Sequence, residues 1–361
     1  MALKVFERYL AREVYASTAL VLTAFLLLFA FFDLIGEMKD LGHGGYQMEN
    51  IVAFVILTVP GRLYELAPIA VLIGTVYAMT TLARHSEITV LRASGLSTAG
   101  FLRMLMRIGS VFVIITLMVG EFVAPPAERA AQQLRLKAMS SMVAQEFRSG
   151  LWVKDERSFV NVRNVQPDAS LQDVRIYEFD NEYHLKTISD AVTGVFIVPD
   201  QWKLGNVTRT IFDTSGERAS VERLPEVMWK SALNPDILSV LLVVPEKMSV
   251  LKLVQYIKHL AENQQKTERY VIALWKKLVY PLTAFVMMIL ALPFSFMSTR
   301  GGTVSLRVFT AIMLGIGFHM LNGLFSNLGV INQWTPFLSA VTPSAIFLAG
   351  AGGLLFWVER R

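Results

Sequence analysis

The sequence of 361 residues contains no cysteine and is poor in charged residues. Without cysteine there is no disulfide, so each domain of the chain must be stabilised by its own apolar core. Charged residues make up 17% of the chain, whereas soluble domains carry about a quarter, and apolar residues make up 53%. This apolar content excludes a disordered chain, and the lack of a short repeat excludes collagen and a coiled coil.

Charged residues are lacking mainly in five apolar stretches, each near or above the length of about 20 residues that spans a bilayer. The last stretch is too long for one span, and polar residues between Asn327 and Pro336 divide it into two. The first is predicted to be a retained span and not a signal peptide, because its apolar run is too long and no small-residue cleavage site follows. We therefore predict six transmembrane helices, in the stretches 14–32, 51–83, 108–124, 278–297 and, as two spans, 308–358.

Lysine and arginine flank these spans unevenly. They precede span 1, separate spans 2 and 3 and spans 4 and 5, and end the chain, whereas the segment between spans 1 and 2 has only Lys39 among three acidic residues. The positive-inside rule then places both termini in the cytoplasm. The net charge of +5 reflects this topology, and the basic residues are too scattered to indicate nucleic-acid binding.

A polar insert separates the first three spans from the last three. We divide the chain into spans 1–3 at residues 1–125, an outer domain at 126–269 and spans 4–6 at 270–361. The insert begins with a helical extension of span 3 over 127–147 and ends with an amphipathic helix over 249–265. Between them, short alternating segments predict an antiparallel sandwich or roll with strands at 151–153, 159–162, 174–179, 194–198, 201–211 and 220–224.

The motifs of the common enzyme classes are missing. No Gly-x-x-x-x-Gly-Lys-Ser/Thr loop occurs, so we expect no nucleotide cofactor, and the five histidines are too far apart to predict a metal site. Ser249 and Lys252 match the Ser-x-x-Lys of serine–lysine hydrolases. About one such match is expected by chance in a chain of this length, and this one falls on the amphipathic helix. We predict neither a catalytic residue nor a metal ligand.

The segment 84–95, between spans 2 and 3, is predicted to form a short amphipathic helix that stops at Gly95. Ile88 and Leu91 make its apolar side. A helix lying on the cytoplasmic face could insert into a groove on a soluble partner, or it could be only an interfacial anchor.

Ionisable residues gather near the outer ends of the spans, among them Lys39, Arg62, Glu65 and Arg135. The stretch 51–83 is longer than the bilayer requires, and we expect a break at Pro60-Gly61 that places Arg62 at the outer headgroup level. Cations there could bind anionic groups of an amphiphile. The alternative is that Arg62 and Glu65 form a pair with each other at i,i+3.

Spans 1 and 5 combine bulky aromatic and small residues. Phe25 and Phe32 in span 1 and Phe318 in span 5 could line an apolar cavity, while Gly315 permits close helix contact. The alternative is that most of these side chains only face lipid.

Four short stretches accompany the six spans that are split three and three around the β-rich insert. They are residues 86–95 (Ser-Glu-Ile-Thr-Val-Leu-Arg-Ala-Ser-Gly), 120–125 (Gly-Glu-Phe-Val-Ala-Pro), 275–278 (Trp-Lys-Lys-Leu) and 150–155 (Gly-Leu-Trp-Val-Lys-Asp). In these features the whole chain resembles the LptF/LptG permeases of lipopolysaccharide export. The stretch 150–155 and the first outer loop are more similar to the LptG branch.

The resemblance implies a permease subunit of an ABC transporter in a Gram-negative inner membrane, with an all-β, jellyroll-like periplasmic domain. The implied partners are a second, LptF-like permease, two copies of a cytoplasmic LptB-like ATPase and a single-span LptC-like protein. Together they extract lipopolysaccharide and pass it to a periplasmic bridge. Spans 1 and 5 are implied to form lateral gates.

The resemblance also implies roles for individual residues. Glu87 matches the carboxylate of the coupling helix that contacts the ATPase, with Leu91 and Arg92 beside it. Lys39 and Arg135 match basic positions that hold the lipid phosphates, whereas Asp33 and Asp40 stand where some relatives carry bases and Arg62 is one place off such a position. The pattern of phosphate-binding residues is therefore expected to be redistributed in this chain.

Two other classes of protein remain open at this point. One is a permease of a different lipid-extracting or lipoprotein-extracting ABC transporter, and the other is a membrane scaffold that presents an outer binding domain. The inserted β-rich domain argues against the first, and six spans exceed what the second requires.

Overall fold

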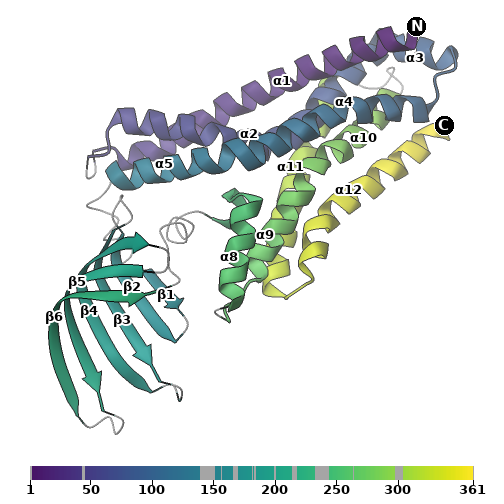
Figure 1. The fold of residues 1–361 in the computed structure, drawn as a ribbon. Coiled ribbons are helices and arrows are strands. Elements are labelled where there is room, and N and C mark those ends of the chain that lie inside the picture. Colours follow the sequence, from purple (N-terminus) through teal and green to yellow (C-terminus); the bar gives the residue numbers. More distant parts are fainter. Residues whose placement is uncertain are drawn as a thin grey trace.

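A computed structural model describes residues 2–42, 45–138, 151–155, 157–165, 170–180, 182, 184–198, 201–213, 218–231, 244–262, 264–296 and 304–360. In these residues, six helical segments are long and apolar enough to cross a membrane, which confirms the predicted number. The first three precede a β-sheet domain and the last three follow it (Figure 1). The helices are α1 (Ala2–Glu37), α2 (Met48–Arg84), α3 (Glu87–Ala93), α4 (Thr98–Met118), α5 (Ala124–Ala138), α8 (Val250–Glu262), α9 (Glu268–Val279), α10 (Thr283–Phe296), α11 (Val304–Ile331) and α12 (Pro336–Glu359).

Helix α2 is continuous, so the expected break at Pro60-Gly61 is wrong. Proline removes one backbone hydrogen bond, at a cost of about 3 kcal/mol in a helix interior. Helices α1, α5, α10 and α11 all pack against α2, and 83% of its most apolar 18 residues are buried in the chain. This packing outweighs the proline. At about 1.5 Å per residue the helix is about 55 Å long, so one end of it must still project beyond the hydrocarbon core.

The third span continues into the insert, as predicted. Helix α4 is capped by Ser97, whose hydroxyl accepts a hydrogen bond from the Gly100 amide at 3.2 Å. It passes through a π-helical turn at Val119–Val123 directly into α5, which runs to Ala138. Single π-helical turns of this kind widen a helix locally and often accompany functional sites. The expected helical residues 139–147 lie outside the described part of the chain.

The β domain is an antiparallel sheet in which, within the described residues, six strands follow one another in sequence order. All six predicted strands are found, although the fourth begins nine residues earlier than expected. Alternate side chains point to one face and form a core that includes Val160, Ile176 and Trp202. The strands are β1 (Leu151–Asp155), β2 (Ser158–Val165), β3 (Leu171–Phe179), β4 (Leu185–Val198), β5 (Gln201–Phe212) and β6 (Ala219–Lys230).

The sheet is strongly curved, as expected for a roll-like domain (Figure 1). Its two end strands approach each other, because the Ser231 hydroxyl, next to β6, donates to the buried Asp155 carboxylate at the end of β1. Val153 of β1 and Trp229 of β6 also belong to the same apolar core. The end strands are therefore joined by one hydrogen bond and by packing, while β1 and β6 each pair with one neighbour in the described sheet.

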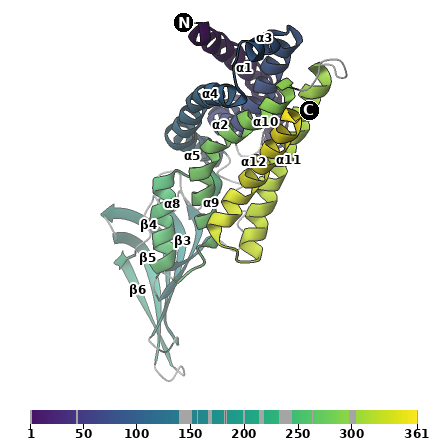
Figure 2. The ribbon, with the colours of Figure 1, turned by 90° about the vertical axis from the view of Figure 1, so that its right-hand side faces the viewer.

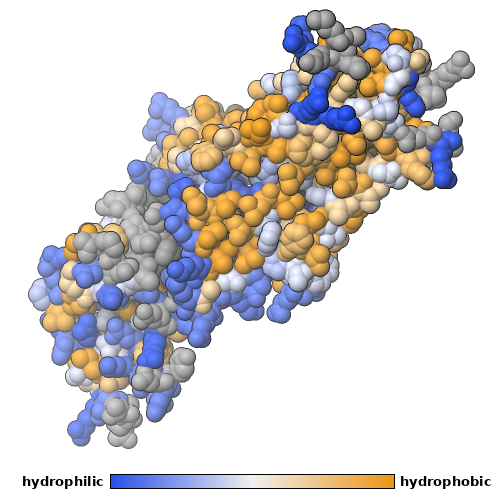
Figure 3. Space-filling view, turned by 45° about the vertical axis from the view of Figure 1, so that its right-hand side comes forward, coloured by the Kyte–Doolittle hydropathy of each residue, from blue (hydrophilic) through white to orange (hydrophobic). Residues whose placement is uncertain are grey.

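The β sheet and the two chain termini lie at opposite ends of the helical bundle (Figures 1 and 2). Helix α3 lies at the end that carries the termini (Figure 1). In the space-filling view, the helical part is covered by a broad hydrophobic surface, whereas the β domain is mostly hydrophilic (Figure 3). An apolar surface of this breadth requires a surrounding of lipid or of other apolar protein surface.

At Gly74, helices α1 and α2 lie so close together that a side chain would not fit between them. A Cβ added there would lie 2.6 Å from the Thr18 Cα and amide nitrogen, which are backbone atoms of α1. Gly74→Ala is expected to push the two helices apart and destabilise the fold by about 1–3 kcal/mol. The measurement is the thermal unfolding midpoint of the purified chain in detergent.

Gly350→Ala in α12 is the matched control, because a Cβ at this glycine meets no atom within 4 Å. It should leave the midpoint unchanged or raise it slightly, since alanine favours a helix over glycine by about 1 kcal/mol. Equal midpoints for the two variants would show that α1 and α2 do not depend on this contact.

Candidate functional site

Helix α3 is the predicted short helix; it ends at Ala93, two residues before Gly95, whose φ of +93° favours glycine. Ile88 is buried and Leu91 packs against the helical core. Val90 on the other side is 66% exposed. The helix thus fixes one apolar side in the bundle and presents a second apolar residue outward.

The candidate coupling residues of α3 contact other helices. The Glu87 carboxylate interacts with the Tyr9 hydroxyl of α1. The Arg92 guanidinium lies over the ring of Phe296 at the end of α10, 4.7 Å from its centroid. Leu91 faces the core, so Val90, which the sequence pattern did not single out, is the apolar residue available to a partner. Helix α3 therefore contacts both the first and the last set of three spans, through α1 and α10.

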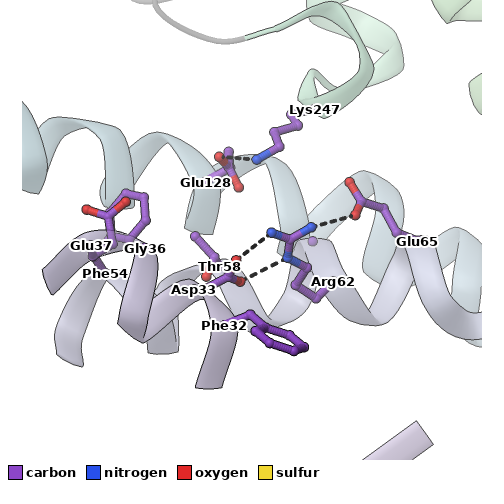
Figure 4. A pocket seen from close by; sticks show the side chains of 11 residues that line it. Phe32, Asp33, Gly36, Glu37, Phe54, Thr58, Arg62, Glu65, Glu128 and Lys247 are labelled. Atoms are coloured by element: carbon purple, nitrogen blue, oxygen red, sulfur yellow. Dashed lines mark hydrogen bonds and ion pairs between the residues drawn. The ribbon is translucent and has the colours of Figure 1, made fainter. Parts of the chain in front are cut away.

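Helices α1, α2 and α5, together with Lys247 from the turn before α8, enclose a polar pocket of about 240 Å³, which we call the mouth pocket (Figure 4). Arg62 of α2 lies at its centre and binds Asp33 of α1 through two hydrogen bonds of 2.6 and 3.0 Å. It also reaches Glu65 at 3.3 Å, so the pair expected from helix spacing exists, but Asp33 is the nearer partner. The pocket is lined by Phe32, Asp33, Gly36, Glu37, Phe54, Thr58, Gly61, Arg62, Glu65, Glu128 and Lys247.

Arg135 of α5 is paired in the same way as Arg62. It contacts Asp40 at 2.8 Å and Glu37 at 3.6 Å. Glu37 also accepts a 2.9 Å hydrogen bond from the buried Tyr46 hydroxyl, and burial, followed by this carboxylate, raises the pKa of Tyr46 so that it remains a donor. Lys39 differs from both arginines, because it is exposed and forms no ion pair with any residue that the structure describes.

The three candidate aromatic residues occupy different environments. Phe32 is 57% exposed and lines the mouth pocket. Phe25 is partly buried against the helical core. Phe318 is only 2% exposed and packs edge-on against Phe347 of α12, with ring centroids 5.2 Å apart. The structure therefore brings Phe32 together with Arg62 in the mouth pocket, which Lys39 and Arg135 do not line, and keeps Phe318 inside the bundle.

A second pocket of about 210 Å³ adjoins the first, and we call it the lysine pocket. It shares Gly61, Glu65, Glu128 and Lys247 with the mouth pocket and extends between α9 and α11. Its further lining residues are Tyr64, Ala124, Glu246, Ala273, Lys276, Lys277, Tyr280, His319 and Asn322. In the sequence, Lys276 and Lys277 stand out only as part of a family pattern. Their position just before an apolar span was the signal that could have marked them as ionisable groups at a membrane edge.

The turn that returns from the β domain closes this lysine pocket. Glu128 of α5 is 3% exposed and binds Lys247 at 2.7 Å (Figure 4). Lys277 donates to the Met248 carbonyl oxygen. Glu121, in the π-helical turn, accepts the Val250 amide at 2.9 and 3.1 Å and so caps the start of α8. Residues 247–250 are thus held by side chains from three separate helical segments.

Both pockets combine cations, carboxylates and aromatic rings at the polar end of apolar helices. Lysine and arginine can bind phosphate, while carboxylates can accept hydrogen bonds from hydroxyl or ammonium groups. In the described residues, no three histidine, aspartate or glutamate side chains are arranged to hold a metal ion. The arrangement is suited to binding the polar part of an amphiphile.

Comparison with known proteins agrees with this arrangement. The family model of the lipopolysaccharide export system permease LptF/LptG matches residues 8–358. The chain is 29% identical to the lipopolysaccharide export system permease protein LptG of Escherichia coli K12 over 344 residues, which is 95% of each chain. It is 28% identical to LptG of Haemophilus influenzae over 356 residues, 98% of each chain. The protein belongs to the LptF/LptG family of lipopolysaccharide export permeases.

Proposed function

We propose that this chain is the LptG-type permease subunit of an ABC transporter that extracts lipopolysaccharide from the inner membrane. The observation that carries the proposal is the mouth pocket, where cations and Phe32 meet at the end of six apolar helices. Membership of the permease family over nearly the whole chain supports the same substrate. Neither a scaffold role nor a lipoprotein substrate has comparable support.

Helices α1 and α11 expose the apolar surface on which a lipid could move. None of the most apolar 18 residues of α1 is buried in the chain; 11% are buried in α12 and 22% in α11, against 83% in α2. An unshielded CH₂ group costs about 0.8 kcal/mol in water, so acyl chains need such a surface as far as the outer pocket. These two faces are where a second permease could enclose a shared cavity, with α1 and α11 as its gates.

Phosphate groups would meet two kinds of cation, one in the mouth pocket at Arg62 and one beside it, where Lys39 and Arg135 lie next to the lining residue Glu37 in the sequence or by ion pair. Lys39 is available without breaking an internal pair among the described residues. Arg62 and Arg135 are each held by two carboxylates, so a phosphate must displace a carboxylate to bind them. Lys39 therefore serves as the first contact, and the arginines bind by exchange of partners.

Energy must reach the pocket from a partner, because the sequence has no phosphate-binding loop. We infer that α3 contacts one of two copies of a cytoplasmic ATPase through Glu87, Val90 and Arg92. A homologous LptF-like permease and a single-span accessory protein complete the complex in this proposal. Both termini then lie in the cytoplasm and the β domain lies in the periplasm, where its end strands can pair with similar domains.

Lys39→Gln is expected to lower the capture of lipopolysaccharide by about tenfold, the equivalent of one charge-assisted contact. Because Lys39 is exposed, the fold should be unaffected. The measurement is photocrosslinking of lipopolysaccharide to a reactive residue placed at Phe32 in the complex. Lys258→Gln, an exposed lysine of α8, is the control and should crosslink normally. Equal crosslinking in both variants would remove Lys39 from the substrate site.

Glu87→Lys is expected to leave the complex assembled but to reduce lipopolysaccharide release per ATP hydrolysed by about tenfold or more, because it reverses a charge at the proposed ATPase contact. Release and hydrolysis are measured together in proteoliposomes. Glu7→Lys makes the same charge change at another cytoplasmic position and breaks only an exposed pair with Arg107, so it should couple normally. A fully coupled Glu87→Lys transporter would contradict the role of α3.

The orientation can be tested with single cysteines, since the natural chain has none. We expect a membrane-impermeant maleimide to label Arg175→Cys in the β domain on intact spheroplasts, and Val90→Cys only after the membrane is opened. Both native side chains are exposed, so each thiol is accessible to the reagent. The reverse labelling pattern would place the β domain in the cytoplasm.

A further inference from the structure

Of the three lysines that line the lysine pocket, Lys276 alone has no hydrogen-bond or ion-pair partner among the described residues. Lys247 is paired with Glu128, and Lys277 donates to the Met248 carbonyl oxygen. Lys276 interacts electrostatically with Glu246 and Glu65, but it forms no hydrogen bond or ion pair with any described residue. A partly buried ammonium group without a direct partner is unfavourable, and an anionic ligand would relieve this cost.

The other groups around Lys276 would suit a ligand that carries hydroxyl or amino groups besides its negative charge. Glu65 and Glu246 can only accept hydrogen bonds when ionised, whereas the Asn322 amide can both donate and accept. A free inorganic anion would leave the carboxylates facing it without donors. The combination therefore favours a phosphorylated sugar over phosphate alone.

The size of the pocket limits which part of such a ligand enters it. Its volume of about 210 Å³ lies below the range of about 300–1,000 Å³ that holds whole drug-sized molecules. A sugar phosphate headgroup matches this volume, whereas a set of acyl chains does not. We propose that the lysine pocket is a second headgroup site, at which Lys276 binds a phosphate of the transported lipid after it leaves the mouth pocket.

The position of the pocket gives this site its place in transport. It shares a wall with the mouth pocket through Gly61, Glu65, Glu128 and Lys247. Glu246 and Lys247, in the turn that leads back from the β domain, also line it, and α9 and α11 form its remaining walls. A headgroup that moves from Arg62 to Lys276 thus passes along the segment that connects the β domain to the last three spans. This inference rests on the proposed function, because it takes the same lipid as its ligand.

The test uses the full complex in nanodiscs with lipopolysaccharide and a photoreactive residue at either Asn322 or Phe32. Crosslinking at Asn322 is expected to fall about tenfold in Lys276→Gln, the loss of one charge-assisted contact, while crosslinking at Phe32 stays within twofold. Lys276→Arg should retain the signal at Asn322, which separates loss of charge from loss of fold. Lipopolysaccharide treated with phosphatase should lose the signal at Asn322 in the wild-type background.

The two reporter positions keep the two proposals apart. Crosslinking at Phe32 together with none at Asn322, or an Asn322 signal that Lys276→Gln and phosphatase leave unchanged, would overturn the second site alone. Binding of inorganic phosphate at Lys276 without lipid crosslinking would assign the pocket to a free anion and would also overturn it. If lipopolysaccharide crosslinks at neither position, the proposed function fails and this site fails with it.

Discussion

A charged group cannot be left without a partner in an apolar surrounding, and this constraint shapes the whole molecule. A lysine, arginine or aspartate at the centre of a membrane helix costs about 2.5–3.5 kcal/mol by insertion measurements, and an uncompensated buried charge costs more. The spans are accordingly almost free of charge over their apolar centres, and the ionisable residues gather at the helix ends. There they form pairs between helices, such as Arg62 with Asp33 and Arg135 with Asp40.

The same pairs determine how the chain can recognise an anion. A free arginine would attract any phosphate, whereas an arginine already held by two carboxylates binds only a ligand that replaces them. Three of the carboxylates that bind these arginines lie on one short segment at the end of α1. They are Asp33, which binds Arg62, and Glu37 and Asp40, which bind Arg135. Displacing them would therefore free the outer end of α1 as one unit, which links recognition of the headgroup to movement of a proposed gate.

The sequence predicted the elements of this fold more completely than their contacts. The length of the apolar runs identifies six spans because the bilayer thickness sets it, and the alternation of apolar residues identifies six strands because the strand pleat sets it. Both signals are local in the sequence. The pair at Arg62 and Glu65 could be expected from i,i+3 spacing, but Asp33, 29 residues away, is a neighbour only because α1 packs along α2. For the same reason the sequence could not predict that Lys247 and Lys276 line one pocket. The expected break at Pro60 failed because packing on several sides of α2 decided the conformation, whereas the local preference of proline did not.

The continuity of α2 has a mechanical consequence. Its C-terminal end at Arg84 is separated from the start of α3 by two residues, and Arg62 of the mouth pocket lies on the same helix. Arg84 follows Arg62 by 22 positions, which correspond to about 33 Å of helix. If the helix were broken at Pro60-Gly61, Arg62 would lie directly at the break. In the continuous helix, a displacement of α3 that α2 transmits would instead move Arg62 against Asp33 of α1. If the proposed ATPase acts on α3, its motion would therefore reach the mouth pocket at the ion pairs that neutralise the cations.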